Sequence, residues 1–159
     1  MKERFSGSEV VEIGIEIEIN GMDFYQKLAT STDNASVKDV FLFLAGEEDN
    51  HIVAFQKLLD SIQEYEPPEA YPGDYFVYMN ALAGSHVFTQ KNKGIEIAGK
   101  IKNDMEAIEI AIGFEKDSIL FFEGMKESVP EQDKSVIDEL VKQEKGHLSR
   151  LHELRRLLI

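Results

Sequence analysis

The chain has 159 residues, with no cysteine and no tryptophan, and its 30 acidic and 17 basic side chains give a formal net charge of -13. The lack of cysteine excludes disulfides, thiolate metal sites, iron–sulfur ligation and a thiol nucleophile. The excess of acid argues against nucleic acid as a partner, because phosphate backbones are bound by clustered Lys and Arg. A hydrophobic fraction of 43% is too high for a disordered acidic tail, so we expect one globular domain over residues 1–159.

No stretch of the sequence reaches the ~18 consecutive apolar residues that a membrane-spanning helix needs. The N-terminal segment MKERFSGSEVVEIG lacks the apolar region of a signal peptide. We therefore expect a cytoplasmic protein with no membrane partner.

Four long stretches have helical periodicity, and each opens with two residues, three apart, that resemble a capping box. The predicted helices are about 7–29, 37–64, 104–127 and 129–158. Their capping pairs are Ser6/Glu9, Ser36/Asp39, Asn103/Glu106 and Ser128/Glu131, with Pro130 in the first turn of the last helix.

The first helix contains a stretch that imitates a β-strand. Residues 11–19 read VEIGIEIEI, and strict alternation normally indicates a strand. The pattern continues into GMDFYQKLA without a turn signal, which gives about 23 residues, too many for an ordinary strand. Only a helix also aligns this segment with the other three, so we predict a helix.

The connections between the predicted helices differ in length. Short connections, 30–35 and 127–129, make antiparallel neighbours of the first two and the last two helices. The connection over 65–102 is long, and its apolar pieces, such as YFVYMNALAG, are expected to form short helices. The predicted fold class is therefore all-α: an antiparallel four-helix bundle with one long crossover between helices 2 and 3.

Each predicted helix carries a glutamate in the middle of its apolar stripe. Steps of three and four residues place these glutamates among Val, Ile, Leu and Phe, whereas a surface helix should carry carboxylates on the opposite face. Two stripes add a histidine one turn after the glutamate. The six residues are Glu18, Glu48, His51, Glu115, Glu144 and His147.

The spacing of these residues indicates an internal duplication, with halves of about 7–64 and 104–158. Glu18 precedes Glu48 by 30 residues, and Glu115 precedes Glu144 by 29. Each half has an aromatic residue seven positions after its first glutamate, Tyr25 or Phe122, and then a turn and Glu-x-x-His. We therefore expect two helical hairpins of one design, related by approximate two-fold symmetry.

Two Glu-x-x-His pairs and two further glutamates are suited to a pair of metal ions. Residues three apart on a helix lie on one face, about 4.5 Å apart along the axis, so each pair can hold one cation. Glu18 and Glu115 come from the other two helices and can bridge. Four buried carboxylates alone would repel one another and protonate, whereas two divalent ions supply the compensating charge. This donor set suits iron or manganese, with zinc as a further candidate, and occurs in ferritin-like proteins.

A purely structural interpretation competes with the metal site. One Glu-x-x-His on a helix is a weak signal, and one histidine on an apolar face is more often a core residue than a ligand. Two such motifs in register with two further buried glutamates are much harder to explain in that way, so we favour the metal site.

The segments EIEINGMDFYQKLA, LAGEEDNH, AIGFEKDSILFFEGM and LVKQEKGHLSRLHELRRLL together resemble the rubrerythrin-type branch of the ferritin-like superfamily. The resemblance covers all four helices and leaves only the crossover unplaced. It implies that Tyr25 donates a hydrogen bond to a ligand carboxylate across the bundle; alternatively, Tyr25 is a core aromatic with any acceptor. It also implies that a dinuclear iron centre is bound by Glu18, Glu48, His51, Glu115, Glu144 and His147.

The sequence departs from full-length rubrerythrins in two places. Those proteins carry a rubredoxin module with four iron-binding cysteines, and this chain has no cysteine, so its electrons must come from a separate donor. They also carry an extra glutamate one turn after the third-helix ligand, which takes part in redox-dependent ligand exchange; Ser118 stands there in this chain. Peroxide reduction of the rubrerythrin kind is therefore an open question, while metal binding is expected.

The resemblance implies an oxidoreductase that reacts with peroxide or dioxygen, as a peroxidase or ferroxidase. The alternatives are a non-enzymatic protein that binds or handles iron, and a structural bundle that uses the ions only for folding. Homodimers are common in this family, and the crossover residues Tyr75, Phe76 and Tyr78 are the candidate contact surface. Of the two remaining histidines, His86 is expected to pack in the crossover and His152 to face solvent.

Overall fold

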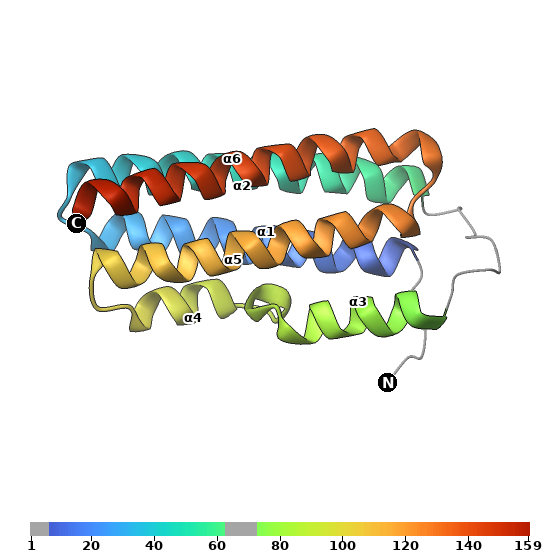
Figure 1. Cartoon of the computed structure of the whole chain (residues 1–159), viewed down its shortest axis with the longest axis horizontal. Helices are drawn as coiled ribbons and strands as arrows, with labels where there is room; N and C mark the ends of the chain where they lie inside the picture. The colour runs from blue at the N-terminus through green and yellow to red at the C-terminus, as the bar shows by residue number, and fades with distance from the viewer. Residues whose placement is uncertain (1–6, 63–72) are drawn as a thin grey trace.

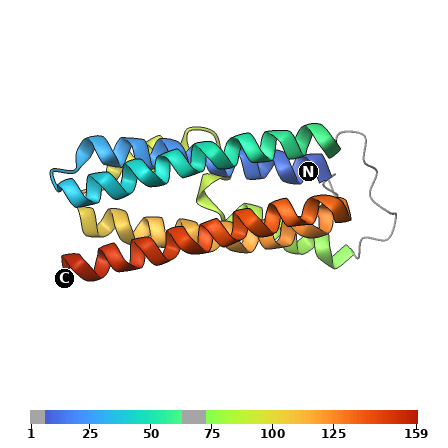
Figure 2. The same ribbon diagram turned by 90° about the horizontal axis from the view of Figure 1, so that it is seen from above.

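The computed structural model describes residues 7–62 and 73–159, and none of these residues lies in a β-strand. Four long helices form a bundle: α1 (Gly7–Ser31), α2 (Ala35–Ile62), α5 (Asp104–Met125) and α6 (Lys134–Leu158) (Figure 1). Hairpin α1–α2 lies beside hairpin α5–α6, as the second view shows (Figure 2). The crossover runs along the bundle as α3 (Gly73–Ser85), a 3-10 turn (Val87–Thr89) and α4 (Lys93–Lys100). The prediction of an all-α bundle with one long crossover is confirmed. None of the described helices has both the length and the apolar character needed to cross a membrane.

The helix starts agree with the predicted caps at only one of the positions that the structure describes. Asn103 Oδ1 accepts a 2.8 Å hydrogen bond from Glu106 N, as predicted for α5. The cap predicted at Ser36 is wrong, because Asn34 Oδ1 accepts from Val37 N at 3.1 Å and α2 already begins at Ala35. Asn34 is the N-cap because it directly precedes the first residue of α2 and its side-chain oxygen accepts from the backbone N–H three residues later. The pair that begins at Ser6 falls outside the described residues.

The predicted start of the last helix at residue 129 is also wrong. Val129 is extended, with φ -119° and ψ 156°, because the proline ring that follows it disfavours helical backbone. The Ser128 hydroxyl donates to Met125 O at 2.8 Å and so closes the end of α5 instead of capping α6. A 3-10 turn at Glu131–Asp133 follows, and α6 begins only at Lys134.

Residues 11–19 are helical although their apolar residues alternate. Helix α1 contacts α2 and α5, and it also contacts α4 and the 3-10 turn of the crossover. Because it is covered on several sides, Val11 and Ile17 are fully buried, while Ile13 and Ile15 are partly buried against the same core. The alternation therefore reflects a helix with an unusually wide buried surface.

Asn20 fastens the crossover to α1. Its side chain is fully buried, and its Nδ2 donates 2.7 Å hydrogen bonds to Phe88 O and Gln90 O. Its Oδ1 accepts from Gly94 N at 2.9 Å. A Cβ at Gly94 would lie only 2.0 Å from Asn20 O, so α4 can approach α1 this closely only with glycine at that position.

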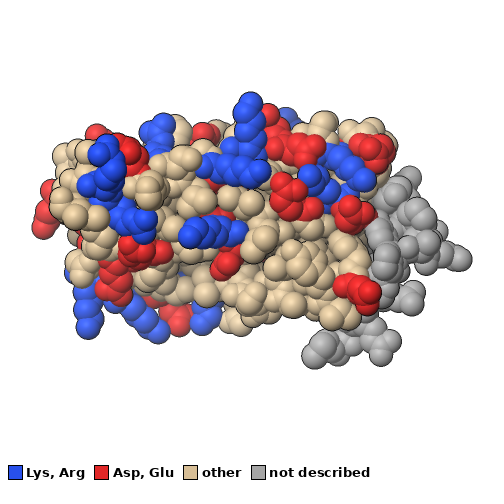
Figure 3. Space-filling model, viewed as in Figure 1, with Lys and Arg blue, Asp and Glu red and all other residues tan. Residues whose placement is uncertain are grey.

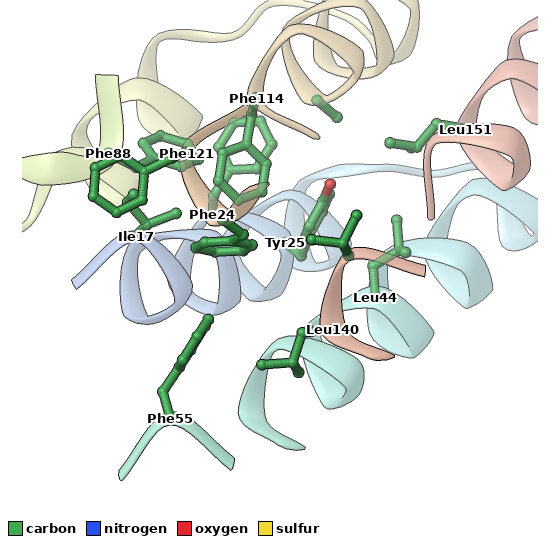
Figure 4. Packing of buried hydrophobic residues seen from close by; sticks show 14 of the residues in the cluster. Ile17, Phe24, Tyr25, Leu44, Phe55, Phe88, Phe114, Phe121, Leu140 and Leu151 are labelled. Carbon is green, nitrogen blue, oxygen red and sulfur yellow. The ribbon is translucent and has the colours of Figure 1, made fainter. Parts of the chain in front are cut away.

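Aromatic side chains fill the space between α1, α5 and the crossover. The rings of Phe88 and Phe114 lie 4.5 Å apart, and Phe24 contacts both Phe88 and Tyr25, at 5.3 and 5.4 Å (Figure 4). Tyr25 is also 6.1 Å from Phe114. This packing fixes the position of Tyr25 at the middle of the bundle, next to the buried polar residues described below.

Candidate metal centre

Each of the four long helices contributes one fully buried glutamate to the middle of the bundle: Glu18 from α1, Glu48 from α2, Glu115 from α5 and Glu144 from α6. His51 and His147 lie one turn after Glu48 and Glu144, and their side chains are 1% and 3% exposed. The structure therefore brings together all six residues that the sequence pattern selected. Helical periodicity explains this, because each residue lies on the stripe that its helix turns inward.

The six residues form two overlapping groups of four. One group is Glu18, Glu48, His51 and Glu144, and the other is Glu48, Glu115, Glu144 and His147. Within each group, one ligand atom from every residue lies within 4.8 Å of the others. Glu48 and Glu144 belong to both groups, so these two are placed to bridge. Glu18 and Glu115, which the sequence analysis considered as bridging residues, belong to one group each.

The two imidazoles direct Nδ1 toward the carboxylates. His51 Nδ1 lies 2.8 Å from Glu18 Oε2 and 2.6 Å from Glu144 Oε1. His147 Nδ1 lies 3.3 Å from Glu48 Oε1, 3.6 Å from Glu144 Oε2 and 3.7 Å from Glu115 Oε1. The two rings are stacked, with centroids 5.4 Å apart. Both histidines thus offer the same nitrogen to the centre of the cluster.

Many polar atoms of this cluster are buried without a hydrogen-bond partner among the described residues. They are Glu18 Oε1, both carboxylate oxygens of Glu48, Glu115 Oε2, both oxygens of Glu144, and both ring nitrogens of His147. Buried polar atoms are nearly always paired in folded proteins, so this concentration needs an explanation. Carboxylate oxygens and imidazole nitrogens are the donors that iron, manganese and zinc accept, and the residues present therefore fit a metal pair.

Burial and the nearby charges shift the pKa values of the cluster residues away from their ordinary values. Burial, reinforced by the neighbouring carboxylates, raises the pKa values of Glu18, Glu48 and Glu115 well above their ordinary range. Burial and the charge of Glu48 also act to raise the pKa of Glu144, but the nearby Glu115 carboxyl and the two nearby imidazoles outweigh them and lower it.

The histidines respond in the opposite direction. Burial acts to lower the pKa of His51, but Glu144 outweighs it and raises the pKa to about 9. The pKa of His147 is raised by Glu115, Glu144 and Glu48 in the same way. Without metal, protons on the carboxyl groups and imidazoles therefore compensate the buried negative charge of the cluster. Since ligands must be deprotonated, two divalent ions would take the place of these protons.

Tyr25 donates a 2.6 Å hydrogen bond from its hydroxyl to Glu115 Oε1, from α1 across to α5. Its side chain is fully buried, and burial together with Glu115 raises the pKa of the phenol well above its ordinary value. At the equivalent place in the second half, Phe122 has no hydroxyl and packs its ring 5.0 Å from Phe55. The two halves of the cluster therefore differ in the groups that support their carboxylates.

Ser118 is fully buried one turn after Glu115, and it contacts a residue that the sequence pattern assigned only to packing. His86 Nδ1 accepts a 3.1 Å hydrogen bond from Phe88 N, so its Nε2 carries the proton and donates to Ser118 Oγ at 3.0 Å. Burial lowers the pKa of His86 to about 4, which keeps the ring neutral. The crossover thus supplies a neutral partner where the rubrerythrin resemblance places a further carboxylate. His152 is exposed, as expected, and lies 3.0 Å from Arg155.

Sequence reasoning did not select Gln143 or Glu47, which stand immediately before the glutamates of the two Glu-x-x-His motifs. Gln143 Oε1 lies 2.8 Å from His51 Nε2, and Glu47 Oε1 lies 4.0 Å from His147 Nε2. Their position next to a predicted ligand glutamate was the sequence signal that could have pointed to them. An open groove between α2 and α6, about 410 Å³ in volume, reaches Gln143 and the outer edge of His51.

This architecture and its buried cluster define the class of ferritin-like helical bundles with a dinuclear carboxylate site. A Thermotoga maritima protein of known crystal structure, assigned as a ferritin-like diiron-carboxylate protein, matches the chain with a TM-score of 0.72 and 28% identity, over 98% of each chain. The family model of rubrerythrin matches residues 9–155, and the chain belongs to the rubrerythrin family. No curated protein matches its sequence significantly.

Proposed function

We propose that the buried cluster holds two iron ions and that the protein is an oxidoreductase, reacting with peroxide or dioxygen as a peroxidase or ferroxidase. The observation that carries this proposal is the pair of four-residue groups that share Glu48 and Glu144. Two bound ferrous ions would supply one electron each, enough to reduce one hydrogen peroxide, with two protons, to two waters. Manganese and zinc suit the same donors, but zinc cannot supply electrons.

The residues of this chain would contribute charge, position and exclusion of water. Four ionised carboxylates balance the four positive charges of two divalent ions. Glu48 and Glu144 would hold the two ions close together, while Glu18 with His51 and Glu115 with His147 would complete one position each. Tyr25 would keep Glu115 in one orientation through its 2.6 Å hydrogen bond. The electrons for turnover would come from a separate donor, because the chain has no cysteine to bind an iron–sulfur or rubredoxin-type centre.

Anaerobic stopped-flow mixing tests the proposal. Protein loaded with two equivalents of Fe(II) is mixed with hydrogen peroxide or with air-saturated buffer, and formation of Fe(III) is followed by absorbance. We expect oxidation at least tenfold faster than that of free Fe(II) in the same buffer, and turnover when a reductant is added. The Glu48→Gln/Glu144→Gln double variant serves as the control. Oxidation no faster than for free Fe(II) would contradict the enzyme proposal.

A non-enzymatic role in binding or handling iron is the second candidate, and the Ser118–His86 pair favours it. A neutral hydroxyl, 3.0 Å from a neutral imidazole, stands where a further carboxylate would otherwise bind or exchange. This role predicts that bound Fe(II) exchanges freely with a chelator and is not oxidised faster than free Fe(II). The stopped-flow measurement and a chelator-exchange measurement together separate the two roles.

A second copy of the chain is the proposed partner of the surface formed by α3, in which Asp74 is the one charged residue. Figure 3 shows a largely uncharged area where Figure 1 places α3, with acidic atoms at its right-hand end. Val77 and Tyr78 are 70% and 47% exposed there, whereas Tyr75 uses its hydroxyl to donate to Gly124 O at 2.7 Å. The contact surface expected at Tyr75, Phe76 and Tyr78 therefore rests on Tyr78 and Val77; the Phe76 side chain lies outside the described part. Sedimentation equilibrium of the parent and of Val77→Asp tests this, and a monomeric parent would contradict it.

A further inference from the structure

We propose that Gln143 and Glu47 are the outer hydrogen-bond partners of the two metal-binding histidines, and that their different charges make the two metal positions unequal. This inference rests on the proposed metal pair, although not on its redox activity.

The orientation of the imidazoles determines where an outer partner must stand. His51 and His147 both direct Nδ1 toward the carboxylates, so an ion bound to Nδ1 leaves the ring proton on Nε2. The Nε2–H then points away from the ion and needs an acceptor, because both rings are buried. The acceptor fixes the tautomer and adjusts how strongly the imidazole donates to the metal.

His51 has a neutral acceptor. Gln143 Oε1 lies 2.8 Å from His51 Nε2. The amide of Gln143 is itself held in this orientation, because its Nε2 donates to Glu139 Oε1 at 3.1 Å. The carbonyl oxygen, and not the amide nitrogen, therefore faces the imidazole.

His147 faces a carboxylate instead. Its Nε2 is buried without a hydrogen-bond partner among the described residues. Glu47 Oε1 lies 4.0 Å from this nitrogen, and the Glu47 side chain is only 29% exposed. A small rotation of the Glu47 side chain brings the carboxylate within hydrogen-bond distance once a proton is fixed on Nε2.

The two partners occupy equivalent positions in the repeated design. Gln143 precedes Glu144 on α6 and faces His51 on α2, while Glu47 precedes Glu48 on α2 and faces His147 on α6. Each Glu-x-x-His helix thus supports the histidine of the opposite hairpin. The positions match, but one side chain is a neutral amide and the other a carboxylate. A carboxylate partner makes an imidazole a stronger donor, and outer partners typically change metal affinity by about 10–100-fold.

Exchanging the two side chains tests the assignment without changing the net charge. In the Glu47→Gln/Gln143→Glu variant the carboxylate faces His51 and the amide faces His147. Zn(II) is added to protein labelled with ¹⁵N-histidine, whose spectrum contains only four histidines, and chelator competition gives the affinity of each step. We expect the first zinc ion to shift its preference toward His51 by about tenfold or more relative to the parent protein.

A single variant separates the two partners. Gln143→Leu removes the acceptor of His51, so we expect one zinc-binding step to weaken about 10–100-fold and the other to remain unchanged, with the ¹⁵N signals of His51 responding in the weakened step. Glu47→Gln keeps the shape and tests His147 in the same way, should the exchanged variant fail to fold. An unchanged order of zinc binding in the exchanged variant, or equal weakening of both steps in Gln143→Leu, overturns the inference. Failure of the parent to bind zinc at all overturns the metal centre itself, and this assignment with it.

Discussion

Tyr25 donates its phenolic hydrogen to Glu115 Oε1 across 2.6 Å, and this bond links α1 to α5 at the level of the buried cluster. Glu115 Oε2 has no hydrogen-bond partner among the described residues, so the Tyr25 hydroxyl is the partner that the structure gives this carboxyl group. In the metal-free protein, the bond therefore has a direct influence on stability.

Replacing Tyr25 with phenylalanine is expected to destabilise the metal-free protein. The ring and its packing remain, but Oε1 of the buried Glu115 carboxyl loses the hydrogen bond from Tyr25, which costs about 1–3 kcal/mol. Urea unfolding followed by circular dichroism measures the effect. Tyr78→Phe, in a side chain that is 47% exposed, is the matched control and should stay within about 0.5 kcal/mol of the parent. Equal stability of Tyr25→Phe and the parent would contradict the role of this bond.

The Asn20 side chain is expected to hold the crossover against the bundle. Asn20→Leu leaves the carbonyls of Phe88 and Gln90 and the N–H of Gly94 without their partner, which costs at least about 2 kcal/mol. Hydrogen exchange should show the largest loss of protection in α4 and the adjacent 3-10 turn. Asn50→Leu, at an exposed position on α2, is the control. Uniform loss of protection over the four long helices would count against a local effect.

The metal-free protein is expected to lose stability as the pH rises from 6.5 to about 9, and His51 is one cause. Burial acts to lower the pKa of His51, but Glu144 raises it from 6.5 to about 9 in the folded protein. A raised folded-state pKa stabilises below the unfolded value, and this contribution disappears as the pH rises through about 9. Urea unfolding from pH 6.5 to 9.5 should show a steeper loss for the parent than for His51→Gln. Parallel curves would remove His51 as the cause.

The position of the six cluster residues could be predicted from the sequence because it depends only on helical periodicity. Once residues 11–19 are recognised as helical, Glu18 and Glu48 must face the same interior, and the same holds for Glu115 and Glu144. The rotation of one helix about its axis relative to the next is set by packing of side chains between helices. For this reason the sequence could not show which glutamates are common to both donor groups, and the structure places Glu48 and Glu144 in both.

Helical periodicity did not select the supporting residues, for a related reason. Gln143 and Glu47 lie outside the apolar stripes, and only the lateral distance between α2 and α6 brings them to the histidines. His86 reaches Ser118 because the crossover is folded onto α5, and no periodicity describes that segment. The predicted starts of two helices were wrong for local reasons. Asn34, and not the selected serine, caps α2, and Pro130 keeps the residue before it out of the helix.

The shared and unshared glutamates are expected to differ in their effect on metal binding. Glu48 belongs to both donor groups, whereas Glu18 belongs only to the group of His51. Removing the charge of Glu48 with Glu48→Gln should therefore weaken both steps of Zn(II) or Mn(II) binding, each by tenfold or more. Glu18→Gln should weaken one step and leave the other within about threefold of the parent protein.

Calorimetric titration with competing chelator resolves the two steps, and the second half of the molecule supplies an independent repeat. Glu144→Gln should behave like Glu48→Gln, and Glu115→Gln like Glu18→Gln, because the same groups contain them in equivalent roles. Circular dichroism of each variant without metal establishes that the bundle is intact, which is expected because a neutral amide relieves repulsion among buried carboxylates. If Glu18→Gln weakened both steps as strongly as Glu48→Gln, Glu18 would be a bridging residue. The two metal ions would then be bridged as the sequence analysis considered, by Glu18 and Glu115, and not by the two glutamates common to both groups.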